Sequence, residues 1–475
     1  MPEYKTPGVY IEEIPKLPPS IASVETAIPA FIGYTEKAKW KEDGDLIMVP
    51  KRIRSMLEYE QYFGSPDPEV ESLSVTFTLS GSTVTDVNGK VDETKRSKFL
   101  MSYSLQMFFT NGGGPCWIVS VGEYQADGGE IVAQKLKDGL AEVSKINEVT
   151  LLLFPDSFNL STQTDYYDVH AAAIQQCQEL QDRFTIMDVY HIEDNANNWL
   201  EDVNAFRSGI GSGDSLKYAA VYFPRIFAGI DYNYKVAGST EDNDASVTVV
   251  GIPGVETLAD LKKGKNAQYF QGKTALSNIQ LLLPASSAMA GIYAQVDNTR
   301  GVWKAPANVN IQNAIGPEIL VTNRDQDDLN VDAQDGKSIN VIRKFEGRGP
   351  AIVWGARTLA GNSNEWRYIS VRRFFNMVEE SVKNATQQFV FEPNDENTWV
   401  RVKSMIQNYL TQQWRGGALM GASVKEAFFV HVGLGETMTE LDIWEGRLII
   451  EIGMAVVRPA EFIILRFMHK MLQES

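Results

Sequence analysis

The residues that most resemble an active site are Gly213, Asp214, Ser215 and Leu216, because this order of residue types is the nucleophile signature of a class of esterases. The segment from Asp188 to His191 could supply the base of a catalytic triad. In those esterases the serine precedes the histidine along the chain, whereas here it follows. Convergent triads permit any order, so an α/β hydrolase that uses Ser215 stays open as the alternative function.

A second candidate for chemistry is Gly272-Lys273-Thr274, which resembles the end of a phosphate-binding loop. Such a loop needs a glycine five positions before this Gly, where the chain has Ala267, and it should follow a buried strand. Residues 262–271 are instead polar and rich in lysine. Gly112 to Gly114 precede an apolar run and do not link a strand to a helix. A nucleotide-driven motor that uses Lys273 is therefore the weaker alternative.

Metal ligands are no better supported. No two of the four histidines (His170, His191, His431 and His469) stand at i, i+4 around a glutamate. A calcium loop counted from Asp328 would put Ala333 where glycine is needed and Ile339 where the bidentate glutamate is needed. We therefore predict that the acidic run from Asp325 to Asp335 is a solvated loop, and we expect no metal and no cofactor.

Composition restricts the partners. The chain has 475 residues and a formal charge of −17, from 44 Lys and Arg against 61 Asp and Glu. An acidic surface repels phosphate backbones and anionic lipids, so nucleic acid and membrane are not expected as main partners. Two cysteines give no disulfide framework, and the start has no secretory signal. We expect two or more domains that fold in the cytoplasm.

The middle of the chain reads as α/β. Apolar runs predict strands at 116–121, 149–154 and 186–189, and apolar residues at helical spacing predict helices over 131–143 and 173–184 between them. Strands that alternate with helices imply right-handed crossovers, and hence a mainly parallel sheet covered on both faces.

Two segments look like insertions. Residues 75–91 alternate between apolar and polar, and Asn88-Gly89 is a turn signal, so we predict a hairpin. Residues 231–251 have a similar residue pattern and are predicted to form a second insertion of the same kind. Both are polar at their tips and are expected to project outward.

Towards the end of the chain, Trp399, Val402, Ile406 and Tyr409 predict a helix over 397–415. Gly416-Gly417 ends it, and strands are predicted over 428–432 and 448–457. The apolar stripe faces a core, which leaves Arg401, Lys403 and Arg415 as a basic patch on an acidic chain. These charges could equally be ordinary solvated helix charges.

The start of the chain is a short strand pattern outside any domain. Pro7 and Pro15 bound it, and Val9 and Ile11 alternate with Tyr10. Such a strand either returns to its own sheet or adds to the sheet of a neighbouring copy, and the sequence leaves both open.

This opening resembles that of the contractile tail sheath family of phage tails, tailocins and extracellular injection systems. Further blocks resemble the family in the same order along the chain, at 26–35, 108–119, 301–308, 339–343, 354–359, 366–373, 390–395 and 458–462. No family pattern is visible at 66–100 or 231–275.

The resemblance implies a structural subunit, not an enzyme, that polymerises as stacked hexameric rings around an inner tube and contracts. It implies an N-terminal arm (1–25), an outer α/β domain (26–345, with insertions at about 66–100 and 231–275), an inner α+β domain (346–457) and a C-terminal arm (458–475). Partners would be other copies, the tube protein, and baseplate and cap proteins; whether sister sheath proteins join them is left open.

The resemblance also implies roles for single residues. Arms that exchange strands between copies would use Val9, Tyr10, Ile11, Ile14, Phe462, Ile464 and Leu465. The tube would be held by Arg401, Lys403 and Arg415. Tryptophan and arginine commonly anchor interfaces, and this role, or one in the core, would fall to Trp354, Arg357, Trp366, Arg372 and Arg373.

Overall fold

The computed structural model describes residues 21–125, 128–190, 198–235 and 242–466. These residues form two compact units, a smaller one of residues 21–24 and 377–457 and a larger one of residues 25–376 and 458–466. The division falls between Asn376 and Met377, inside the helix α10 (Ile369–Thr386). The domain boundary expected at 345 stays a prediction.

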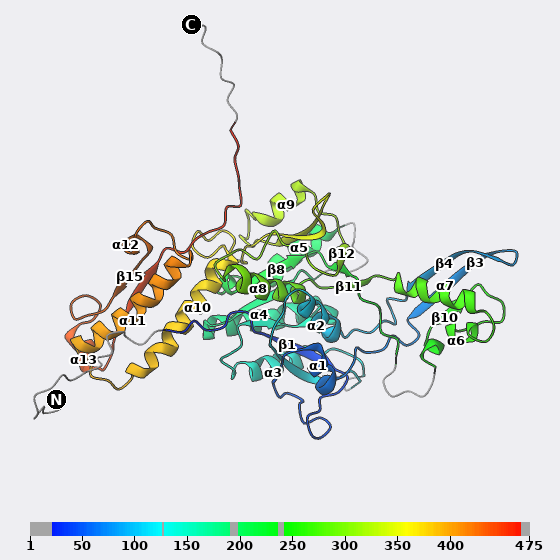
Figure 1. The fold of residues 1–475 in the computed structure, drawn as a ribbon, viewed down its shortest axis with the longest axis horizontal. Coiled ribbons are helices and arrows are strands. Elements are labelled where there is room, and N and C mark those ends of the chain that lie inside the picture. Colours follow the sequence, from blue (N-terminus) through cyan, green and yellow to red (C-terminus); the bar gives the residue numbers. More distant parts are fainter. Residues whose placement is uncertain (1–20, 126–127, 191–197, 236–241, 467–475) are drawn as a thin grey trace, which may run out of the picture. The chain divides into compact units, whose positions relative to one another are not determined.

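The larger unit is built on an eight-stranded sheet in the order β14-β13-β8-β7-β6-β1-β5-β2. Two of its strands, β1 and β8, are labelled in Figure 1. Its strands are β1 (Pro29–Thr35), β2 (Lys51–Ile53), β5 (Cys116–Glu123), β6 (Leu151–Leu153), β7 (Phe184–Asp188), β8 (Ala219–Phe223), β13 (Asn340–Phe345) and β14 (Gly349–Trp354). The six inner strands pair in parallel, and the edge strands β2 and β14 are antiparallel to their neighbours. The mainly parallel sheet predicted from the alternating strands and helices is confirmed.

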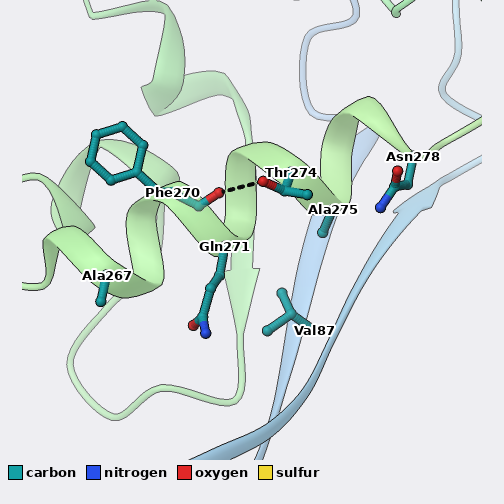
Figure 2. A pocket seen from close by; sticks show the side chains of 7 residues that line it. All are labelled: Val87, Ala267, Phe270, Gln271, Thr274, Ala275 and Asn278. Atoms are coloured by element: carbon teal, nitrogen blue, oxygen red, sulfur yellow. Dashed lines mark hydrogen bonds between the residues drawn. The ribbon is translucent and has the colours of Figure 1, made fainter.

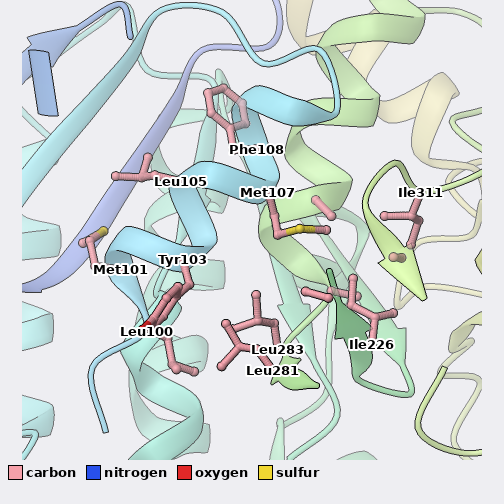
Figure 3. Packing of buried hydrophobic residues seen from close by; sticks show 14 of the residues in the cluster. Leu100, Met101, Tyr103, Leu105, Met107, Phe108, Ile226, Leu281, Leu283 and Ile311 are labelled. Carbon is pink, nitrogen blue, oxygen red and sulfur yellow. The ribbon is translucent and has the colours of Figure 1, made fainter. Parts of the chain in front are cut away.

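Helices cover both faces of this sheet, as the alternation of buried side chains requires. Leu151 and Leu153 of β6 join the core under α2 (Met101–Thr110) and α8 (Ser286–Arg300), and Leu152 joins the opposite one. That second core lies under α3 (Ala133–Val143), α4 (Gln163–Leu180) and α5 (Trp199–Gly209). Figure 3 shows the first core, in which α2 packs near a small sheet of β9 (Ile226–Ala228), β11 (Leu281–Leu283) and β12 (Ala314–Pro317).

The helix predicted over 173–184 is displaced. It starts earlier, at Gln163, and ends at Leu180, because Gln181 takes the left-handed conformation (φ +60°). Phe184, predicted to lie on the apolar stripe of this helix, is instead the first residue of β7. The helical spacing of Phe184 gave no indication that the helix ends before it, at the left-handed residue Gln181.

The two predicted insertions form one body. The hairpin of β3 (Leu73–Ser80) and β4 (Thr83–Val91) is confirmed, but Asn88-Gly89 lies inside β4 and the turn falls at Gly81-Ser82. The second insertion is not a hairpin of its own. In its described residues the strand β10 (Thr248–Val250) pairs in parallel with β3, and α6 (Leu258–Leu261) and α7 (Asn266–Ser277) complete the body.

Gly89 has a packing role that a turn signal cannot describe. A Cβ atom at this position would lie 2.4 Å from the carbonyl oxygen of Ala275, so glycine is what allows α7 to approach β4 so closely. The residue pair Asn-Gly therefore marks a close contact between a helix and a strand, and the sequence offered no means of telling this from a turn.

The smaller unit packs α11 (Glu396–Arg415) beside the second half of α10 and a two-stranded antiparallel sheet of β15 (Phe428–His431) and β16 (Glu451–Met454). The stripe predicted for α11 is buried at Val402, Ile406 and Tyr409. Shorter elements of the chain are α1 (Met56–Phe63), α9 (Asn323–Asn330), α12 (Val424–Ala427) and α13 (Glu440–Trp444). Among the described residues, none of the helices combines the length and apolar character needed to cross a lipid bilayer.

Candidate functional site

Of the candidate triad residues, the structure describes Ser215 and Asp188. Ser215 lies on a short 3-10 helix (Asp214–Tyr218), and His191 lies outside the described residues. The Asp188 carboxylate accepts hydrogen bonds from the backbone N–H groups of Ala285 (2.8 Å) and Ser286 (3.1 Å), where α8 begins. Burial raises the pKa of Asp188 to about 6. Asp188 therefore caps a helix.

A serine–histidine contact that the sequence analysis did not single out joins Ser157 Oγ and His170 Nε2 at 3.1 Å. Both residues are only 2% exposed, and burial lowers the pKa of His170 to about 3. The imidazole is therefore neutral at physiological pH, and a substrate in solution cannot reach the serine. We interpret this pair as part of the core.

Gly272-Lys273-Thr274 lies inside α7, so its backbone N–H groups are used by the helix and cannot cradle a phosphate. Lys273 Nζ lies 3.2 Å from Asp244 Oδ1 and hydrogen-bonds the Tyr234 hydroxyl. Figure 2 shows the shallow hollow beside this helix, which is lined by Val87, Ala267, Phe270, Gln271, Thr274, Ala275 and Asn278. None of these side chains is positively charged, so the hollow has no group that attracts a phosphate.

The predicted solvated loop is only partly confirmed: residues 331–335 lie outside helix and strand and Asp335 is exposed, whereas Asp325, Asp327 and Asp328 lie in α9. Asp325 caps the start of α9 together with Thr322. Asp332 is buried, lies 3.5 Å from Arg207 Nε and accepts the backbone N–H of Lys337 (3.2 Å). In the described part of the chain, no group of three or more His, Cys, Asp or Glu residues could hold a metal ion.

Two consecutive arginines hold the first turn of α10. Arg372 stacks on Trp366, 4.3 Å from the ring centroid, and its Nε donates to Asn376 Oδ1 at 2.8 Å. Arg373 forms a bidentate ion pair with Asp297 of α8, at 2.5 and 3.0 Å. Both arginines are at most 5% exposed, so they contribute to the core of the larger unit within a single subunit.

Trp354 is half-buried at the end of β14. Its ring packs against Phe345, with centroids 4.7 Å apart, and Arg348 lies over it at 5.1 Å. This residue therefore closes the antiparallel edge of the large sheet.

The C-terminal arm begins with an ion pair and continues as an exposed apolar segment. Arg357 Nη2 and Nε lie 2.5 and 2.9 Å from the two carboxylate oxygens of Glu461, and the Tyr368 hydroxyl donates to Glu461 at 3.2 Å. The side chains that follow are 70–81% exposed: Phe462, Ile463, Ile464 and Leu465. Four consecutive apolar side chains in water are typical of a binding segment. The predicted N-terminal residues Val9, Tyr10, Ile11 and Ile14 lie outside the described residues.

The basic patch predicted on α11 faces solvent, with weak partners. Arg401 is 57% exposed and lies 3.9 Å from Glu392, and Lys403 is 33% exposed and lies 3.7 Å from Glu436. Arg415 is exposed in the last turn of the helix. Ion pairs this long and this exposed contribute little to stability, at most about 1 kcal/mol.

Comparison with known proteins identifies the family. Residues 362–469 match the model of the phage tail sheath C-terminal domain. A chain from the anti-feeding prophage baseplate is 32% identical over 98% of this chain and 100% of that chain, with a TM-score of 0.63. A chain from the contracted helical sheath of the same particle is 31% identical over 98% and 100%, with a TM-score of 0.66. This chain belongs to the contractile tail sheath family.

Other relatives match this sheath protein over shares of the chain that range from about a quarter to nearly all of it. A chain of the contracted PVC sheath, from an extracellular contractile injection system, is 29% identical over 99% of both chains, with a TM-score of 0.63. The tail sheath protein of Vibrio phage KVP40 is 31% identical over 129 residues, 27% of this chain. The chain aligns with only 19% to 31% of the length of the curated phage sheath proteins it matches.

Sequence reasoning missed two acidic residues that organise this sheath subunit. Asp156 accepts the backbone N–H groups of Tyr34 (2.7 Å), Leu100 (2.6 Å) and Met101 (3.1 Å), and so ties β1 to the start of α2. Gly33 makes room for it, since a Cβ there would lie 2.3 Å from Asp156 Oδ2.

Glu461 was the other missed residue, which the sequence analysis included only within the family block at 458–462. A single charge at the head of an apolar run is the signal that could have drawn attention to it.

Proposed function

We propose that this chain is the structural subunit of a contractile sheath, which polymerises helically as stacked hexameric rings around an inner tube and contracts to drive the tube through a target envelope. The observation that carries this proposal is the similarity over almost the whole chain to a subunit of a contracted helical sheath. We infer that the subunit has no enzymatic activity and needs no cofactor. The hydrolase alternative finds no support in the geometry around Ser215.

We propose that both arms exchange strands between copies, through Val9, Tyr10, Ile11 and Ile14 at one end and Phe462, Ile464 and Leu465 at the other. Two features of the described residues support this. The apolar side chains of 462–465 are exposed, and β15 and β16 form a sheet of only two strands, which is marginal without further strands. Backbone hydrogen bonds to an added strand would link copies through changes in their relative tilt.

We further propose that residues 346–457 form the inner part of the sheath and residues 26–345 the outer part, with the insertions at about 66–100 and 231–275 as outward decoration. Arg401, Lys403 and Arg415 would hold the tube. Their exposure and long ion pairs suit a contact that must release during contraction, because each contact is weak while many together are strong.

The proposed partners are other copies of this chain, the tube protein, and baseplate and cap proteins; sister sheath proteins would be additional members of the same lattice. The match to a chain in a baseplate structure supports the baseplate contact. The subunit would assemble in the cytoplasm and then form part of a phage tail or a released phage tail-like particle. Energy stored at assembly in a metastable extended state would replace a nucleotide.

Electron microscopy of the purified protein tests the proposal. We expect tubular polymers or stacked rings from the full chain. Deletion of residues 1–15 should leave a folded subunit, by circular dichroism and thermal unfolding, that forms no stable sheath. Uniform small particles from the full chain under all conditions would contradict the sheath function, and normal contractile tubes from the truncated chain would contradict exchange at this end.

A further inference from the structure

We propose that Arg357, Tyr368 and Glu461 form a latch that fixes the point where the C-terminal arm leaves the larger unit, so that only residues from Phe462 onward are free to join a neighbouring copy. This inference rests on the proposed function, because it concerns the arm that would be exchanged. It assigns a positioning role to these three residues.

Residues outside the C-terminal arm hold Arg357 in place. The backbone N–H of Arg357 donates to Asn340 Oδ1 at 2.7 Å, and its carbonyl oxygen accepts from Asn340 Nδ2 at 2.8 Å. Its Nη1 donates to the carbonyl oxygen of Asn330 at 3.1 Å. Its Nε and Nη2 donate to the two carboxylate oxygens of Glu461. A planar arginine fixed on one side in this way presents a rigid fork to a carboxylate.

Burial makes Glu461 the carboxylate partner on which Arg357 depends. The side chains of Arg357 and Glu461 are 4% and 16% exposed, and Arg357 has no other carboxylate within ion-pair distance among the described residues. The hydrogen bond to Glu461 is the largest cause that raises the pKa of Arg357. A buried guanidinium without its carboxylate would be strongly unfavourable, so the free subunit should keep Glu461 in place.

The exposure of the side chains rises sharply immediately after the latch. Glu461 is mostly buried, whereas Phe462 is 70% and Ile463 is 81% exposed. An arm with a fixed root searches fewer conformations than a free tail of the same length. Fixing the root therefore raises the effective concentration of the arm at a neighbouring copy and lowers the entropy lost when it binds.

The test uses the full chain with Glu461→Gln, which keeps the shape and removes the charge, and Glu365→Gln as a matched control at an exposed glutamate of the same unit. A dye on Leu465→Cys reports the mobility of the arm by fluorescence anisotropy, since both native cysteines are buried. In chains without the dye, light scattering against protein concentration gives the critical concentration for sheath assembly.

We expect Glu461→Gln to lower the anisotropy and raise the critical concentration about tenfold, which corresponds to about 1.4 kcal/mol, while Glu365→Gln changes neither. Unchanged anisotropy, or lower anisotropy with unchanged assembly, would overturn the latch. If Glu461→Gln does not fold, Tyr368→Phe, which removes one hydroxyl, decides in the same way with a smaller shift of about threefold.

A third variant that ends after Glu461 separates the latch from the proposed function. If this truncated chain assembles normally, exchange of the C-terminal arm is wrong. If it fails to assemble while Glu461→Gln assembles like the parent, the exchange survives and the latch is overturned.

Discussion

The exposed apolar segment at 462–465 allows a sharp test of strand exchange. In an extended chain, alternate side chains point to opposite sides, so Phe462 and Ile464 share one face and Ile463 and Leu465 share the other. Glu461 binds Arg357 of its own subunit, so in an arm that is extended throughout, residues 463 and 465 would share the side of Glu461. We therefore predict that Phe462→Ala with Ile464→Ala weakens sheath assembly more than Ile463→Ala with Leu465→Ala.

The magnitude follows from the exposure of the side chains. Phe462 and Ile464 are 70% and 76% exposed, so truncating them in the free subunit should cost less than about 0.5 kcal/mol each. Complete burial of such a side chain contributes about 1.5–3 kcal/mol, of which roughly three quarters is still available to a neighbour. The loss for the pair is about 2–4 kcal/mol per contact, so the critical concentration should rise on the order of a hundredfold.

Sedimentation of polymers against protein concentration measures this effect, and thermal unfolding of the unassembled subunit is the control. The second pair is the matched variant, since Ile463 and Leu465 are 81% and 71% exposed in the free subunit. Equal, small effects of both pairs would refute burial of one face by a neighbour. A lower unfolding temperature of either unassembled variant would refute the premise that these side chains are free in the subunit.

Three further predictions concern other parts of the molecule. Burial raises the pKa of Asp156 to about 7, above the value of about 4 in an unfolded chain, so its contribution to stability is full below about pH 4 and is lost as the pH rises through 7. Urea unfolding between pH 4 and 8 should show this loss of stability in the parent and less of it in Asp156→Asn. The same dependence of unfolding free energy on pH in both proteins would contradict the prediction. Reversal of Arg401 and Lys403 to Glu should weaken co-assembly with the tube, most at low salt, without affecting sheath self-assembly; equal sheathing of the tube by parent and variant at every ionic strength would place the tube contact elsewhere. Removal of residues 75–91 alone should make the insertion body sensitive to proteases, because β3 is its central strand. Replacing both that hairpin and residues 236–279 by short Gly/Ser bridges should preserve assembly. Loss of polymers with an intact subunit would show that the insertion body contacts a neighbour.

The sequence alone determined those features whose cause lies within a few residues. Apolar runs of four to six residues alternating with helical stripes predicted the parallel sheet, because strands buried on both faces must be apolar throughout. The stripe on α11 predicted its buried face in the same way. The ordered family blocks predicted membership of the sheath family, although they did not indicate what each block does.

The tertiary structure alone decided the pairings between distant segments. β10 joins β3 in parallel although the two come from separate insertions, and Arg357 meets Glu461 across 104 residues of chain. The local sequence around these strands and side chains does not identify their partners, because hydrophobic periodicity indicates which residues are buried but not what they pack against. Asp156 shows the same limit: one carboxylate among 61 acidic residues became a buried anchor only because folding brought three backbone N–H groups around it.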